Sequence, residues 1–202
     1  MKKILLVTDG IFHPPLTARK ALHKTLADLD RFEFQHVRSM EKLPSELSVF
    51  SALVLYMHHK KISGSALEAL DGFVSNGGGI LGVHTATASF QQQLHYFEIL
   101  GGRFTGHGPV ESFEVEPISG SDIFPGFPVF TVKDELYIHE IQPGNTVHFT
   151  AKHEGHDIPV VWTRQYGQGR VCYMVPGHTT TSMHNRTYQE LLQRGLSWVC
   201  NT

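Results

Sequence analysis

The sequence is poor in cysteine, with only Cys172 and Cys200 among 202 residues. The two residues do not form a CxxC pair, and a disulfide framework would require more of them. Neither is in a position typical of a nucleophile, since Cys172 lies in a predicted strand and Cys200 at the end of a predicted helix. We therefore expect a protein without disulfide bonds in the cytoplasm.

Long hydrophobic runs are also missing. No stretch approaches the roughly 18 consecutive apolar residues of a membrane span. The apolar run near the N-terminus is short and ends at Asp9-Gly10, which is typical of a strand and not of a signal peptide. The formal net charge is −2, so no basic surplus indicates nucleic-acid binding. We expect neither a membrane nor a nucleic acid as partner.

Motifs for nucleotides and for zinc peptidases are absent from the sequence. There is no GxxxxGK[ST], and the glycines at 77–79 precede a predicted strand instead of following one, so we expect no nucleotide cofactor. There is no HExxH either, so any metal ligands would have to come from distant parts of the chain.

The patterns that are present predict an α/β domain. Continuous apolar runs at 3–8, 52–57 and 80–83 are typical of strands buried on both faces of a parallel sheet. Apolar residues at helical spacing over 16–29 separate the first of these runs from a predicted strand at 32–38. This alternation indicates βαβ units and a mostly parallel central sheet. The length suits one domain, residues 1–202.

The second half of the sequence is richer in strands. Short apolar or alternating segments predict strands at 110–115, 146–151, 159–163 and 170–175, followed by a closing amphipathic helix over 186–199. Apolar surface around these strands leaves a homo-oligomer open.

Histidine is abundant, with 14 residues. Most are expected at the surface: His23, His95, His148, His153 and His156 have polar neighbours. Others follow predicted strands, where side chains of a parallel sheet converge on one edge. His13, His58, His84 and His178 are in such positions.

His84 has the most specific context. The sequence 79–86, Gly-Ile-Leu-Gly-Val-His-Thr-Ala, is a strand that turns sharply. It is similar to a nucleophile elbow, in which a residue is held exposed above the sheet. A histidine at this point is suited to metal binding or proton transfer. The alternative is that His84 only hydrogen-bonds a neighbouring loop.

Five sequence stretches, in this order, carry a resemblance to a known family: 77–84 (GGGILGVH), 100–107 (LGGRFTGH), 134–137 (DELY), 159–164 (PVVWTR) and 166–178, which includes YGQGRV and ends in Gly-His. The chain resembles the class I glutamine amidotransferase-like superfamily and, more narrowly, the trehalose-utilisation (ThuA-like) family. This implies a flavodoxin-like three-layer sandwich. The stretch 122–128 departs from the family pattern because it lacks a histidine, which puts any role of that loop in doubt.

The resemblance implies an enzyme that processes a disaccharide or an oxidised sugar, with a small-molecule carbohydrate as partner. The reaction would be a hydrolysis, a lyase step or an isomerisation. The superfamily's cysteine position is occupied by His84, so glutamine amidotransfer is not expected. His178 matches the catalytic histidine of the superfamily. A non-catalytic sugar-binding or regulatory domain is the alternative, and an amidase using Thr85 or Ser89 is less favoured because neither lies at the elbow.

Several residues are candidates for the site. The resemblance favours Glu135 over Asp134 as general base or partner of a histidine, since neighbouring strand residues face opposite ways; the alternative is a solvated turn. The glycine-flanked segment 106–109 is expected to be a mobile loop. The remaining predictions are three substrate-binding residues, His58, Tyr137 and Arg164, and four ligands of a divalent metal, most simply zinc, namely His13, His84, His107 and His178. A metal-free site with histidines as acid and base is an equal alternative.

Overall fold

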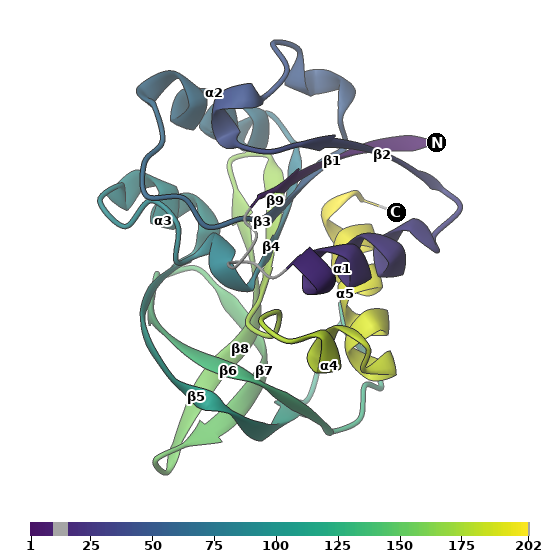
Figure 1. The fold of residues 1–202 in the computed structure, drawn as a ribbon, viewed down its shortest axis with the longest axis vertical. Helices are drawn as coiled ribbons and strands as arrows, with labels where there is room; N and C mark the ends of the chain where they lie inside the picture. The colour runs from purple at the N-terminus through teal and green to yellow at the C-terminus, as the bar shows by residue number, and fades with distance from the viewer. Residues whose placement is uncertain (10–15, 202) are drawn as a thin grey trace.

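The computed structural model describes residues 1–9 and 16–201, and within them the chain alternates strands and helices before a strand-rich second half (Figure 1). The strands are β1 Lys2–Thr8, β2 Phe32–Val37, β3 Ala52–Tyr56, β4 Gly79–Val83, β5 Gly102–Pro117, β6 Phe130–Ile141, β7 Thr146–His153, β8 His156–Tyr166 and β9 Gly169–Met174. The α-helices are α1 Leu16–Ala27, α2 Gly64–Ser75, α3 Leu94–Leu100, α4 Thr180–Met183 and α5 Arg186–Val199, with 3-10 turns at Met40–Lys42, Leu47–Val49 and His84–Ala86.

One half of the sheet is parallel. The strand order is β2-β1-β3-β4-β9-β8-β7-β5-β6, and each neighbouring pair from β2 to β9 is parallel. The first five strands therefore have the flavodoxin order. Strands β3 and β4 are buried along their whole length, and Figure 1 shows α1 and α5 on one side of this part and α2 and α3 on the other. The predicted sandwich is present here.

The expectation of a mostly parallel sheet is wrong for the molecule as a whole. The pairs β9–β8, β8–β7, β7–β5 and β5–β6 are all antiparallel. The connections from β7 to β8 and from β8 to β9 are the short turns 154–155 and 167–168, and antiparallel neighbours need only a hairpin turn whereas parallel ones need a crossover. Strand periodicity reveals such segments but not their direction.

The antiparallel part curls back toward the parallel part. Strand β5 pairs with β7 only through Glu116 and Pro117, and with β6 along nearly all its length, with two register shifts near Gly106 and His107. Strand β6, although last in the strand order, also contacts β8 and α4. Register shifts of this kind bend a strand pair and increase its twist. The β5–β6 ribbon thereby reaches the carboxyl ends of β4 and β9.

The closing helix was predicted with its observed bounds, 186–199. Its buried face includes Tyr188, Leu192 and Leu196, and the helix packs against β4 and β9. Asn185 accepts a hydrogen bond from the Tyr188 backbone N–H and caps its first turn. Among the described helices, none is both long and apolar enough to cross a membrane.

Candidate functional site

His84 occupies a strained turn directly after β4. Its φ is +45°, a left-handed conformation that is uncommon for a residue with a Cβ atom. The side chain is fully buried. The loop after β9 approaches it closely: a Cβ on Gly177 would lie 2.5 Å from His84 Cβ. Glycine at 177 is thus required for this approach, and the turn agrees with the predicted elbow.

Hydrogen bonds fix both the ring and the backbone carbonyl group of His84. Its Nδ1 donates to the carbonyl oxygen of Val175 at 2.8 Å, since a carbonyl can only accept. Its own carbonyl oxygen accepts from the Tyr173 hydroxyl at 2.6 Å and from Thr87 Oγ1 at 3.3 Å. With Nδ1 bonded to Val175, the other ring nitrogen, Nε2, lies toward Glu135.

Glu135 lies between two histidines. Its Oε2 is 3.6 Å from His84 Nε2 and 3.3 Å from His178 Nδ1, and the two imidazole centroids are 5.6 Å apart. His84 and His178 follow β4 and β9, which are parallel neighbours with Val83 opposite Met174. The structure thus brings together the three residues predicted to be catalytic, and we call His84, Glu135 and His178 the triad.

Asp134 faces the other way and holds the loop that carries His178. The residue is fully buried. Its carboxylate accepts from the backbone N–H groups of Gly177, His178 and Thr179 at 3.0–3.2 Å, and from the Ser182 hydroxyl. Three backbone donors can stabilise a buried carboxylate. The alternative that residues 134–135 form a solvated turn is therefore wrong.

The charge of Glu135 is balanced by its neighbours. Burial acts to raise the pKa of this carboxyl, but His84, His178 and His107 together outweigh burial and leave the pKa below its ordinary value. The group is thus held as a carboxylate at neutral pH, ready to accept a proton or to ligate a cation.

His107 and Tyr137 form one wall beside the triad. His107 Nδ1 is 3.8 Å from Glu135 Oε1 and donates to the Gly108 carbonyl oxygen at 2.7 Å. His107 belongs to β5, so the expectation of a mobile loop at 106–109 is wrong. The strand continues through these residues, with a register shift against β6 after His107. Tyr137 is buried against His84, with ring centroids 4.0 Å apart, and leaves little ring surface for a ligand.

A further histidine, His139, is buried beside the site and was not predicted. Its Nε2 is 2.9 Å from Thr87 Oγ1, the hydroxyl that also contacts the His84 carbonyl. Its ring packs edge-on against Trp162 and Tyr173. Burial, and to a lesser extent His84, lowers the pKa of His139 to about 3. Its position two residues after Tyr137 on one strand face is the signal that could have revealed it.

His148 was predicted at the surface, and this is wrong. Its Nδ1 pairs with Ser121 Oγ at 2.8 Å and its Nε2 with Thr163 Oγ1 at 2.7 Å, and only 3% of the residue is exposed. Burial lowers its pKa to about 4. Polar neighbours in sequence did not indicate exposure because the buried partners come from two other segments.

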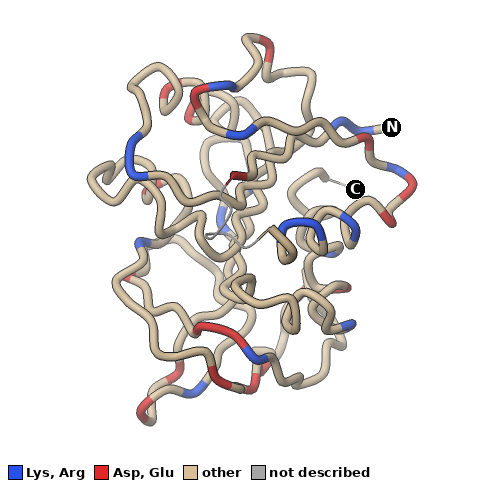
Figure 2. The backbone as a smooth tube through the Cα atoms, viewed as in Figure 1, with Lys and Arg blue, Asp and Glu red and all other residues tan. Residues whose placement is uncertain are grey.

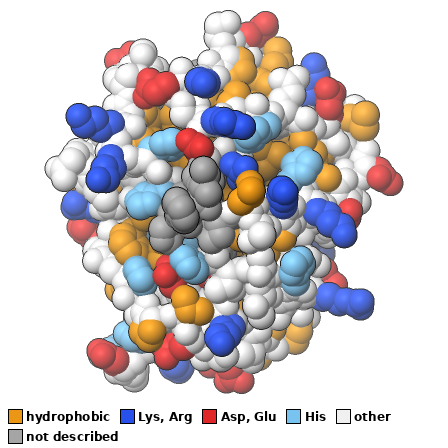
Figure 3. Space-filling model, viewed as in Figure 1, with side chains coloured by type: hydrophobic (Ala, Val, Ile, Leu, Met, Phe, Trp, Pro, Cys, Tyr) orange, Lys and Arg blue, Asp and Glu red, His pale blue; other side chains and the backbone are white. Residues whose placement is uncertain are grey.

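The remaining predicted site residues are His13, His58 and Arg164. His13 lies outside the described residues. His58 follows β3 and is exposed. Arg164 lies in β8 opposite Val171, which pairs with Ile80 near the start of β4, so it is at the opposite end of the strands from His84. Figure 3 shows that several histidine side chains nevertheless share one face of the molecule.

The triad fits a divalent metal. The three ligand atoms offered by His84, Glu135 and His178 lie within 4.8 Å of one another. His84 Nε2 and Glu135 Oε2 are both buried, lie 3.6 Å apart and have no hydrogen-bond partner among the described residues, and a cation ligated by both atoms would satisfy them. Two histidines and a glutamate are a common ligand set for catalytic zinc. The bond from His84 to Val175 would orient the ring as in many metal sites.

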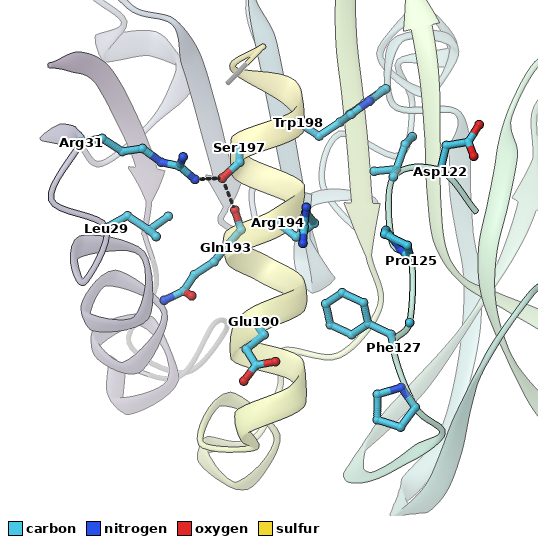
Figure 4. A pocket seen from close by; sticks show the side chains of 13 residues that line it. Leu29, Arg31, Asp122, Pro125, Phe127, Glu190, Gln193, Arg194, Ser197 and Trp198 are labelled. Carbon is cyan, nitrogen blue, oxygen red and sulfur yellow. Dashed lines mark hydrogen bonds between the residues drawn. The ribbon is translucent and has the colours of Figure 1, made fainter. Parts of the chain in front are cut away.

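A cavity at a different place in the molecule has different properties. It measures about 840 Å³ and is formed by α5 and the segment before β6, with Arg31, Asp122, Phe127 and Trp198 among its walls (Figure 4). Arg31 donates to Ser197 within it. Among the described residues that line the cavity there is no histidine and no member of the triad. We therefore assign the functional site to the triad and not to this cavity.

Comparison with known proteins agrees with the fold and the motifs. Two putative ThuA-like proteins have similar structures. The one from Parabacteroides merdae ATCC 43184 has 21% identity and a TM-score of 0.87, with 98% of this chain and 90% of that chain covered. The one from Bacteroides uniformis ATCC 8492 has 18% identity and a TM-score of 0.83, with 98% of this chain and 91% of that chain covered. A GH42 β-galactosidase from G. stearothermophilus matches over 96% of this chain and 30% of its own, with 17% identity and a TM-score of 0.66. No curated protein matches. The model of the ThuA family, described as trehalose utilisation, matches residues 3–199, and the chain belongs to this family.

Proposed function

We propose that this protein is a metal-assisted enzyme acting on a disaccharide or an oxidised sugar. Its metal would be held by His84, Glu135 and His178. The observation that carries the proposal is the pair of buried atoms His84 Nε2 and Glu135 Oε2, which lie 3.6 Å apart and have no hydrogen-bond partner among the described residues. Membership of the trehalose utilisation family supports a sugar-related role.

The residues around the triad have separate tasks in this proposal. A zinc ion would act as a Lewis acid toward a hydroxyl or carbonyl oxygen of the sugar. His178, with 21% of its side chain exposed, and His107, with 41%, are on the solvent side of the site, whereas His84 is fully buried. We assign proton transfer to the substrate to His107, because its ring is the more exposed of the two and it is not one of the three metal ligands. Tyr137 and Asp134 position the site.

The reaction is a hydrolysis, a lyase step or an isomerisation. All three need an acid or base close to a sugar oxygen, and His107 beside the triad would supply it. Glutamine amidotransfer does not suit it. Cys172 and Cys200 are both buried, and burial raises the pKa of each thiol, which disfavours the thiolate that such a reaction requires.

The first experiment measures metal on protein purified without a histidine tag. We expect one zinc per chain after zinc addition and removal of excess, and a loss of at least tenfold in affinity in Glu135→Gln. His156→Gln is the matched control, since His156 is exposed at the start of β8. Fewer than about one metal in ten wild-type chains would contradict the metal site.

The second experiment is an activity screen on oxidised and unmodified disaccharides. His84→Ala and His178→Ala should each abolish turnover while circular dichroism shows the native fold. Wild-type turnover in either variant would refute the assigned site. Sugar binding by calorimetry without turnover, in zinc-replete protein, would instead support the non-catalytic alternative.

A further inference from the structure

A second pocket lies between α1 and the sheet edge formed by β1 and β2, near the carboxyl ends of these strands. The triad follows the carboxyl ends of β4 and β9 in the same sheet. It has a volume of about 430 Å³, within the range of about 300–1,000 Å³ that is usual for small-molecule sites. The described residues that line it are Leu6, Thr8, Arg19, Lys20, His23 and His36. Four of these six side chains carry nitrogen that can donate hydrogen bonds, and none is acidic.

The helix over the pocket has a one-sided charge. α1 contains Arg19, Lys20 and Lys24 and no aspartate or glutamate, as the tube coloured by charge shows (Figure 2). Arg19 and Lys20 precede His23 by about one turn, so the three lie along one side of the helix. His23 is placed over β2 by its edge-on contact with Phe34, at 5.8 Å between ring centroids.

The acidic side chains nearby are directed elsewhere. Glu33 is in β2, but alternation along the strand puts it on the face opposite Phe34 and His36. Asp9, which follows β1, forms an ion pair with His59 at 3.5 Å. Within the described part of the chain, the positive charges of Arg19 and Lys20 therefore have no carboxylate among the residues that line the pocket.

Strand β1 adds a hydroxyl to the pocket. His36 Nε2 donates to the Thr8 carbonyl oxygen at 3.1 Å, because a carbonyl can only accept. The same nitrogen is 2.5 Å from Thr8 Oγ1. Thr8 Oγ1 and the His36 ring are thus held together at the wall of the pocket. The pocket thereby combines two cations, two imidazoles and one hydroxyl.

We propose that this pocket binds the phosphate or sulfate group of a small organic molecule. A tetrahedral oxyanion uses charged donors on several sides, and arginine and lysine are the residues that most often supply them. The volume exceeds that of the anion alone and accommodates an attached ring. The proposal concerns a site separate from the triad and does not require the proposed function.

The pocket adjoins the loop that carries His178. Thr8 is opposite Tyr56 in the parallel pair of β1 and β3, and the Tyr56 hydroxyl donates to the carbonyl oxygen of Gly177. Arg19 is near enough to Tyr56 to lower its pKa, although burial, the largest effect, raises it. An anion held by Arg19 would therefore lie beside the same rim as the triad.

Calorimetry with chelator-treated protein tests the proposal without the metal site. The probes are inorganic phosphate, inorganic sulfate, methyl phosphate and methyl sulfate, with chloride as the background ion. We expect saturable binding of one anion per chain, and the tighter of the two methyl esters identifies which ester the pocket takes. Arg19→Gln should weaken binding at least about tenfold, since hydrogen bonds between a charged donor and an oxyanion are stronger than those between neutral groups.

Two variants on the same helix separate a pocket from a diffuse charge effect. Lys20→Gln removes an exposed charge inside the pocket and should weaken binding. Lys24→Gln removes the same charge outside it and should change affinity less than about twofold. Absence of saturable binding in the wild type would overturn the proposal, and so would equal weakening in Lys20→Gln and Lys24→Gln. Amide shifts on phosphate addition should centre on β1, β2 and α1, and shifts centred elsewhere would also overturn it.

Discussion

Replacing His139 by glutamine should make the free energy of unfolding fall less steeply as the pH is lowered. In the folded protein, burial and then the nearby His84 lower the pKa of His139 from 6.5 to about 3. In the unfolded chain the residue takes up a proton below about pH 6.5, whereas in the folded protein it stays neutral, so acid favours the unfolded state. The contribution of neutral His139 to stability is complete above pH 6.5 and is lost progressively toward pH 3.

The expected magnitude follows from the two pKa values. At pH 5, His139 should cost the wild type about 2 kcal/mol relative to pH 7.5, rising to about 5 kcal/mol below pH 3. His148, with a pKa lowered to about 4, adds a similar acid sensitivity. Because His148 is present in both proteins, its effect cancels when the wild type is compared with His139→Gln.

Urea unfolding at pH 7.5 and pH 5.0 measures this difference. The wild type should lose about 2 kcal/mol more than His139→Gln between the two pH values, whereas His156→Gln, at an exposed position, should lose as much as the wild type. An NMR titration of wild-type His139 covers the case in which the variant does not fold: the imidazole should stay neutral at pH 5. Protonation of folded wild-type His139 near pH 6.5 would refute the reasoning.

Two further substitutions test how the site is held in place. Asp134→Asn removes the charge that accepts three backbone N–H groups of the loop after β9; zinc affinity, measured by competition with a chelator, should fall about 10–100-fold, and unchanged affinity would contradict the positioning role. Gly177→Ala places a Cβ 2.5 Å from His84 Cβ and should cost about 1–3 kcal/mol in urea unfolding. Gly106→Ala, where a Cβ meets nothing within 4 Å, is its control, and equal costs in the two variants would count against the close approach.

The sequence predicted the strands that lead into the site better than it predicted which residues pack around the site. The apolar runs before His84 and His178 are strands because each is buried on both faces, and such runs are visible without a structure. Glu135 was chosen by resemblance, while the reasoning from residues left a solvated turn open. His139 and His148 could not be recognised as buried, because the residues that cover them lie on other strands.

By itself, the sequence determined which segments become buried strands and helices, and that His84 and His178 follow two of those strands, because local periodicity reflects burial. The tertiary structure alone decided that β4 and β9 are neighbours and that the β5–β6 ribbon curls back, which brings Glu135 to within 3.6 Å of His84 Nε2 and His178 Nδ1. Strand direction, register and curl depend on pairing between residues far apart in the chain, and no local pattern records such pairing.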